Sequence, residues 1–129
     1  MNQLAPPKAQ VRRIRSFVKR AGRTTKAQEK AIATLGSKFL LSYQVAPFDW
    51  SVFEEGYQNS PRILEIGFGM GETTALIAQE RFGDIFLGLE VHEPGVGALL
   101  KRVGELNLPN LRLIAHDAVE VLNSMIELN

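Results

Sequence analysis

Three short apolar runs, each followed by a stretch with helical spacing, constrain the fold of this chain most strongly. The runs cover residues 63–66, 85–91 and 111–115. The second run is almost continuously apolar, as is typical of a parallel strand that is covered on both faces. Repeated alternation of strand and helix predicts an α/β fold with a doubly wound parallel sheet.

The helices predicted between these strands are amphipathic. The first covers residues 73–82 and is expected to place Leu76 and Ile77 on its buried side. Pro94 suits the first turn of the second helix. Five apolar residues of that helix share the core-facing spacing: Val96, Leu99, Leu100, Val103 and Leu106.

A last helix is predicted to begin at Asp117. Asp117 and Glu120 have the spacing of a capping box, in which each side chain bonds the backbone amide of the other residue. Three apolar residues are then expected to face the core: Val119, Leu122 and Ile126.

The N-terminal region lacks the alternation of strand and helix. Residues 1–10 predict a disordered lead-in, and residues 11–21 predict a basic helix that Gly22 ends. Thr25 and Gln28 form a capping box for a second helix that runs toward Gly36. Residues 43–61 predict a packed connection with short turns.

Charge divides the chain near residue 48. Residues 1–48 hold ten Lys or Arg and one acid, a net charge of +9, whereas residues 49–129 carry −8. We therefore expect a basic N-terminal arm with helices over 1–48, which contacts a polyanion such as nucleic acid, and a ligand-binding body over 49–129. An Arg-rich, acid-poor start is also typical of a mitochondrial transit peptide.

Composition excludes several classes of site. The chain has no cysteine, so disulfides, thiolate–zinc sites and cysteine catalysis are excluded. No apolar run reaches the roughly 18 residues of a membrane span, so we expect no membrane contact and a cytoplasmic protein. With only His92 and His116 as histidines, no metal site is expected, and both are interpreted as pocket-lining or surface residues.

A Gly-rich turn, Gly67 to Gly71, follows the first predicted strand. Ligands of open α/β sheets bind at the carboxyl ends of the strands, and glycines let the backbone approach them closely. A dinucleotide fingerprint that starts at Gly67 requires glycine at position 72, where this chain has Glu72. This favours a cationic methyl donor over a nicotinamide dinucleotide, which stays open as an alternative.

Three acids stand at the ends of the predicted strands. Glu65 precedes the turn and suits the amino or sulfonium group of S-adenosylmethionine. Glu90, nineteen residues after Gly71, is placed to accept hydrogen bonds from ribose hydroxyls. Asp117 is placed to recognise an adenine amino group, although its expected role as a helix cap explains it equally well.

Five segments of the chain together resemble the bacterial tRNA (guanine-N7-)-methyltransferases. They are RRIRSFV (12–18), AGRTTKAQ (21–28), LEIGFGMGET (64–73), EVHEPGVG (90–97) and HDAVEVL (116–122). The resemblance covers nearly the whole chain. It implies a Rossmann-like sheet of the class I methyltransferase type, with S-adenosylmethionine as cofactor and tRNA, methylated at N7 of guanine 46, as partner.

The resemblance also implies which residues bind each ligand. The donor would be bound by Glu65, Gly67, Gly69, Gly71, Glu90, Val91, His92, Asp117 and Ala118. The tRNA would be contacted by Arg12, Arg13, Arg15, Lys19, Arg20, Arg23 and Lys26.

Members of the family continue for about as many residues again, and that part holds their catalytic Asp and a Pro-Asp-Pro-Trp-type motif. We therefore expect a sheet truncated after about three strand–helix units, a catalytically incomplete chain, and no catalytic residue within it. Its first strand would be an apolar edge, prone to self-association unless another polypeptide supplies the rest. A non-catalytic module that binds S-adenosylmethionine or RNA is the alternative.

Overall fold

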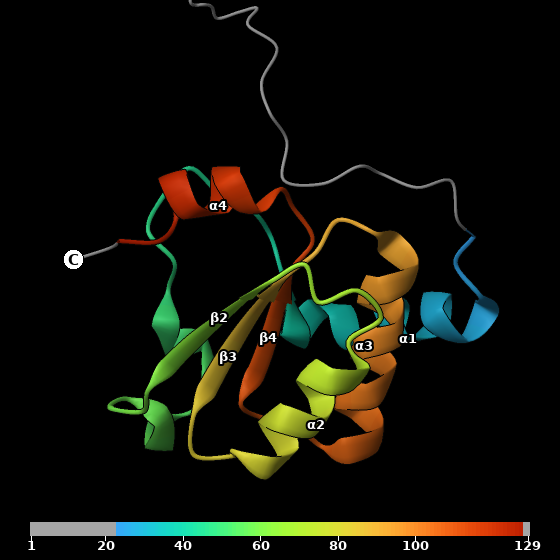
Figure 1. The fold of residues 1–129 in the computed structure, drawn as a ribbon, viewed down its shortest axis with the longest axis horizontal. Helices are drawn as coiled ribbons and strands as arrows, with labels where there is room; N and C mark the ends of the chain where they lie inside the picture. Colours follow the sequence, from blue (N-terminus) through green and yellow to red (C-terminus); the bar gives the residue numbers. More distant parts are fainter. Residues whose placement is uncertain (1–22, 128–129) are drawn as a thin grey trace, which may run out of the picture.

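A computed structural model describes residues 23–127 of the chain. Its centre is a four-stranded, entirely parallel sheet in the order β1-β4-β3-β2 (Figure 1). The strands are β1 (Leu40–Leu41), β2 (Arg62–Ile66), β3 (Ile85–Leu89) and β4 (Leu111–Ile114). The predicted α/β class with a parallel sheet is confirmed.

The described residues also form four α-helices and two short 3-10 helices. The α-helices are α1 (Lys26–Phe39), α2 (Glu72–Glu80), α3 (Glu93–Leu106) and α4 (Ala118–Ser124). The 3-10 helices, η1 (Trp50–Val52) and η2 (Glu55–Tyr57), lie in the connection from β1 to β2, where short turns were predicted.

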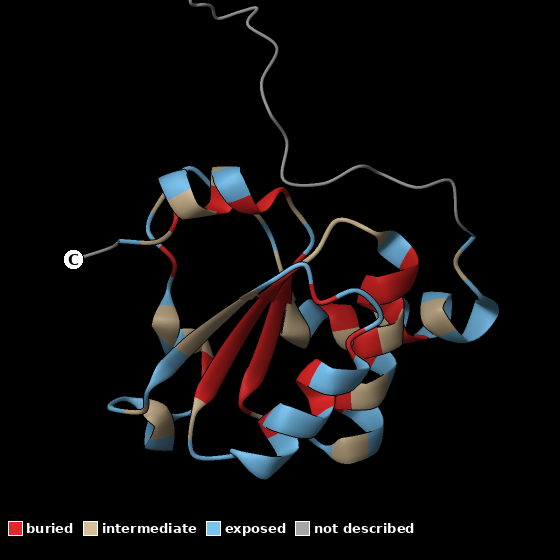
Figure 2. Cartoon of the chain, in the orientation of Figure 1, coloured by how far each residue is buried: buried red, intermediate tan, exposed pale blue. Residues whose placement is uncertain are grey.

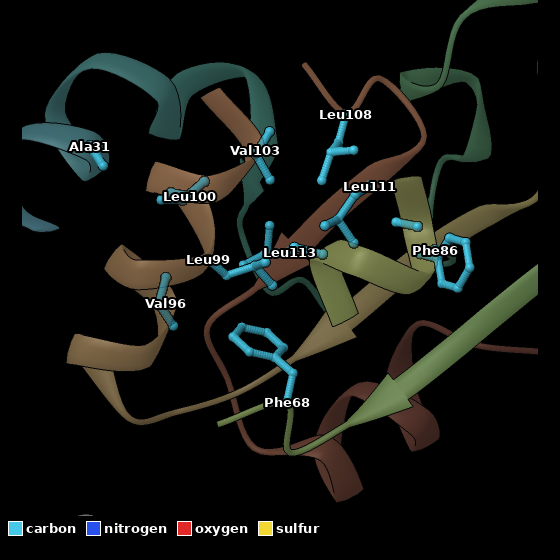
Figure 3. Packing of buried hydrophobic residues seen from close by; sticks show 12 residues of the cluster. Ala31, Phe68, Phe86, Val96, Leu99, Leu100, Val103, Leu108, Leu111 and Leu113 are labelled. Atoms are coloured by element: carbon cyan, nitrogen blue, oxygen red, sulfur yellow. The ribbon is translucent and has the colours of Figure 1, made fainter. Parts of the chain in front are cut away.

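The sheet separates two apolar clusters. On one face, α1, α2 and α3 pack over Phe86, Leu111 and Leu113, and Figure 3 shows Leu111 and Leu113 beside the labelled side chains of α3. On the other face, α4 and the 42–60 connection cover Leu87 and Ile114. Both faces of the sheet are therefore covered, as in a doubly wound fold.

The middle strands are far more buried than β2. Every residue of β3 and β4 is buried, whereas β2 runs from half-buried to exposed, and Figure 2 shows this contrast. No described strand pairs with the outer side of β2, so it is one edge of the described sheet. Ile66, at its end, is 52% exposed.

The described residues before the first predicted strand pack against the same sheet. Thr25 and Gln28 form the predicted capping box, and α1 continues past the buried Gly36 to Phe39. No sequence pattern predicted β1, which pairs with β4. The basic helix predicted over 11–21 lies outside the described residues.

The prediction for the buried face of α2 is wrong. Leu76 and Ile77 are 53% and 38% exposed, and the buried residues are Thr74, Ala75 and Ala78. Small side chains occupy this face because α2 starts very close to α3: a Cβ at Gly71 would lie 2.6 Å from the Leu99 Cβ.

The predicted start of α4 needs correction too. Asp117 occupies the N-cap position, but its side chain makes no capping hydrogen bond. Glu120 Oε1 instead bonds His116 Nε2 at 2.5 Å, so the capping box does not form. Val119, expected in the core, is 40% exposed, while Ile126 packs against the second cluster as predicted.

Arg112 is a buried cation in the centre of β4. Its guanidinium lies 4.8 Å from the Phe39 ring centre and 5.1 Å from that of Phe53, and it donates to the Val52 carbonyl at 3.2 Å. Burial lowers the pKa of Arg112, an effect that the charge of Glu54 opposes. This side chain therefore joins the β1–β2 connection to the sheet.

Asn110 performs a similar joining role at the end of α2. Its buried Nδ2 donates to the carbonyl oxygens of Ala78 at 3.0 Å, Arg81 at 3.3 Å and Asp84 at 2.9 Å. Carbonyls at a helix C-terminus lack partners within the helix, and the Asn110 amide supplies a donor to such groups. The Arg81 carbonyl also accepts the Asp84 amide at 3.0 Å.

We predict that Asn110→Ala lowers the free energy of unfolding by about 2–3 kcal/mol, since buried carbonyls left without a donor carry a desolvation cost. Urea denaturation followed by circular dichroism measures the change. Asn123→Ala, at an exposed position of α4, is the matched control and should change stability by under about 0.5 kcal/mol. Equal stability of the two variants would contradict the role given to Asn110.

Candidate functional site

The loop from β2 to α2 adopts a backbone that requires glycine. Gly67, Gly69 and Gly71 have φ of 70°, 64° and 79°, in the left-handed region. The Gly67 amide donates to the Leu89 carbonyl at 2.8 Å, and the Gly71 amide donates to the Phe68 carbonyl at 2.9 Å. We call residues 67–71 the glycine loop.

Phe68 anchors the glycine loop to the core. Its side chain is buried and points from the loop toward the apolar cluster in Figure 3. A Cβ at Gly88 of β3 would lie 2.8 Å from Phe68 Cδ2, so the ring occupies the space that a side chain would fill. The two flanking glycines, Gly67 and Gly69, face open space, where a Cβ would meet nothing within 4 Å.

Glu65 is the penultimate residue of β2, and Ile66 separates it from the glycine loop. Its Oε1 accepts a 2.8 Å hydrogen bond from Thr74 Oγ1, and Thr74 is buried in α2. The hydroxyl fixes one carboxylate oxygen of Glu65 at the carboxyl-terminal edge of the sheet. Sequence reasoning missed Thr74, because nothing local marks a threonine in an apolar helix face as the partner of an acid.

Glu90 links the glycine loop to the turn after β3. Its Oε1 accepts from the Gly69 amide at 2.7 Å. Its Oε2 accepts from the amides of Val91 at 3.0 Å and His92 at 3.2 Å. Glu90 is therefore held in place by three backbone donors, and His92 is the N-cap residue of α3.

The end of β4 contributes His116, Asp117 and Ala118. The His116 ring stacks on Tyr43 with centroids 3.8 Å apart and planes 7° apart, and Tyr43 Oη shares a 2.8 Å hydrogen bond with Ser124 Oγ. Asp117 is 5% exposed and opens α4. Tyr43 was not predicted as part of the site, because it is distant in sequence and follows a two-residue strand.

These strand ends meet at one shallow pocket. Its volume is about 60 Å³, and it is lined by Ile66, Gly67, Leu89, Glu90, Val91, His116 and Ala118. Four of these, Gly67, Glu90, Val91 and Ala118, are among the predicted donor-binding residues, and His92 and Asp117 directly adjoin them in sequence. Parallel strands thus bring three separate segments to one edge, as expected for α/β ligand sites.

Two larger hollows lie elsewhere, along β2. One of about 500 Å³ includes Phe53 and Tyr57, and the other, of about 380 Å³, includes Leu64 and Met125. Arg62 lines both, with its guanidinium 4.4 Å from the Trp50 ring centre. Neither hollow contains a predicted donor-binding residue. We therefore place the candidate site at the smaller pocket, which is lined by four of them.

Of the predicted tRNA-binding residues, the structure describes only Arg23 and Lys26, which are exposed before and at the start of α1. Arg12, Arg13, Arg15, Lys19 and Arg20 lie outside the described residues.

Within residues 23–127, no group of three or more His, Asp or Glu side chains could hold a metal ion. No helix in the same range is long and apolar enough to cross a membrane.

The described residues form a Rossmann-like α/β domain with a glycine loop and acids at the carboxyl edge of its sheet. Residues 59–129 match a family model described as "Putative methyltransferase". The chain belongs to this methyltransferase family.

Curated relatives carry a more specific name. A tRNA (guanine-N(7)-)-methyltransferase of Ralstonia nicotianae is 62% identical over 115 residues, covering 89% of this chain and 45% of the relative. Proteins of the same name from Burkholderia thailandensis and Cupriavidus metallidurans are 59% and 56% identical, over 90% and 94% of this chain. The chain spans less than half the length of these relatives.

Proposed function

We propose that this chain binds S-adenosylmethionine at the carboxyl-terminal edge of its sheet and serves methyl transfer to N7 of guanine 46 in tRNA. The observation that carries the proposal is the arrival of three acids, Glu65, Glu90 and Asp117, at the edge that bears the glycine loop. Membership of the methyltransferase family and high identity to relatives named for this reaction support it.

The charges around the glycine loop favour a cationic ligand. A dinucleotide places its pyrophosphate at the N-terminus of the helix after the loop. Here the first residue of α2 is Glu72, whose carboxylate also pairs with Arg102 at 3.2 Å. A carboxylate at that point repels a pyrophosphate, whereas it tolerates the positive sulfonium and ammonium groups of a methyl donor.

Each part of the site has a distinct proposed role. The backbone at Gly67 and Gly69 borders open space, so a ligand can approach the loop closely. Glu90, with the adjoining Val91 and His92, would hold the ribose hydroxyls. The remaining donor-binding roles are those of Glu65 for the ammonium or sulfonium group, Gly71 for the loop turn, and Asp117 with Ala118 for the adenine edge.

The bound donor supplies an electrophilic methyl group, and guanine N7 supplies a lone pair without a proton to remove. Consequently no general base is required, and the protein acts by positioning and by stabilising positive charge on the purine. N7 faces the deep groove of A-form RNA, so the base must leave its stack. None of the described side chains is assigned a catalytic role.

A second candidate function is a non-catalytic module that needs a partner, and the exposed edge of β2 favours it. Half-exposed Ile66 ends this edge, and both larger hollows flank it. An apolar strand edge readily pairs with another strand. We propose that in this case a further polypeptide segment, or a second copy of the chain, covers β2 in the cytoplasm, and that the chain itself only binds S-adenosylmethionine or RNA.

For donor binding, we predict that Glu65→Gln weakens the affinity for S-adenosylmethionine at least tenfold, because one charge-assisted hydrogen bond contributes about 1.5–3 kcal/mol. Isothermal titration calorimetry measures the change. Glu93→Gln, at an exposed position of α3, should bind like the unaltered chain. Tight NAD binding without a response to S-adenosylhomocysteine would instead identify an oxidoreductase domain.

For catalysis, we predict that the purified chain binds the donor but transfers no labelled methyl group to tRNA that lacks the N7 modification. Scintillation counting of the recovered tRNA measures transfer. The longer Ralstonia nicotianae relative is the positive control. Transfer by this chain alone would show that it completes the site with residues not identified above.

For the basic segment, we predict that replacing Arg12, Arg13 and Arg15 with Ala weakens tRNA binding and reduces the slope of log affinity against log salt by about 2–3, since each phosphate contact contributes about 0.9. Filter binding at several salt concentrations gives the slope. A variant with Arg81, Lys101 and Arg102 replaced controls for net charge. If both triple variants behave alike, residues 1–48 have no special role in tRNA contact.

A further inference from the structure

Gly69, at the middle of the glycine loop, is contacted from two directions by the turn that follows β3. On its amide side, Glu90 Oε1 accepts its N–H at 2.7 Å. The other oxygen of the same carboxylate is bonded to the amides of Val91 and His92. Glu90 therefore fixes the position of Gly69 relative to the backbone of the turn after β3.

On its carbonyl side, Gly69 rests against Gly95 in the first turn of α3. A Cβ at position 95 would lie 1.9 Å from the Gly69 oxygen and 2.9 Å from its carbonyl carbon. Both are backbone atoms, so no side-chain rotation relieves the clash. Gly95 is buried, and its own amide donates to the His92 carbonyl at 2.9 Å.

We propose that Gly95 is a positioning residue for donor binding and that, together with Glu90, it clamps Gly69 in the conformation the ligand requires. The inference rests on the proposed function, since it assumes that the glycine loop holds the donor. Gly95 does not touch the ligand itself. It acts through Gly69, whose displacement would change the spacing between Gly67 and Glu90 across the pocket they line.

The other close-packed glycines of α3 face a different neighbour. A Cβ at Gly97 would lie 2.6 Å from Gln28 Cβ and 3.0 Å from the Gln28 carbonyl oxygen. A Cβ at Gly104 would lie 2.8 Å from Leu35 Cδ1. Both contacts are with α1, so of these three glycines only Gly95 contacts the glycine loop. Gly97 is therefore a matched control for the stability lost when a side chain is added to a close-packed position of α3.

The test compares Gly95→Ala with Gly97→Ala in the full chain. We expect both variants to unfold at lower temperature, but only Gly95→Ala to weaken S-adenosylhomocysteine binding, at least tenfold by calorimetry. We also expect the Gly69 amide to exchange with solvent at least tenfold faster in Gly95→Ala, measured by NMR without ligand. Binding by Gly95→Ala within twofold of the unaltered chain, or equal losses in both variants, would overturn the proposal.

The exchange measurement separates this inference from the proposed function. If the unaltered chain binds no donor, the proposed function fails, whereas faster exchange at Gly69 still supports the clamp. Should Gly95→Ala fail to fold, Glu90→Ala removes the other contact. Unchanged protection of the Gly69 amide in that variant overturns the clamp, and a tenfold loss confined to the glycine loop supports it.

Discussion

The parallel register of β2, β3 and β4 is the constraint on which the candidate site depends. Ile66 pairs with Leu89, and Leu89 pairs with Ile114, so the three strands end level with one another. The residues that follow these strand ends therefore emerge at one edge, although they are far apart in the sequence. A shift of one residue in any pairing would turn every side chain of the shifted strand to the opposite face of the sheet.

Close backbone approach is the second requirement, and small residues meet it at each contact. Gly88 leaves room for the Phe68 ring, which anchors the loop in the core. Gly71 brings α2 against Leu99, and Gly95 brings α3 against the loop. Protein interiors are close-packed, so each contact transmits a displacement to the next element instead of absorbing it. The loop geometry is thus a property of the surrounding packing and not of the loop sequence alone.

The elements predicted with most success were those whose signal is local. The apolar runs predicted the three longer strands, and the Thr25–Gln28 spacing predicted the start of α1. Prediction failed where a long-range contact decided the outcome. Leu76 was expected in the core because large apolar residues usually are buried, but the proximity of α3 leaves space only for small side chains on that face of α2. β1 is fixed by its pairing with β4, which two residues cannot signal.

In the candidate site, too, local signals were predictable and long-range contacts were not. The spacing of the glycines and strand-end acids predicted which residues gather at the edge, but not how the acids are held. Among the described residues, Thr74 fixes Glu65 and three backbone amides fix Glu90, so the donors that orient these two carboxylates are neutral. Groups ordered before binding spare a ligand part of the entropic cost of association. Because their partners are neutral, the carboxylates also keep their negative charge available for a cationic ligand. The negative charge at this edge favours a cation over a polyanion, whereas the basic composition of residues 1–48 favours a polyanion.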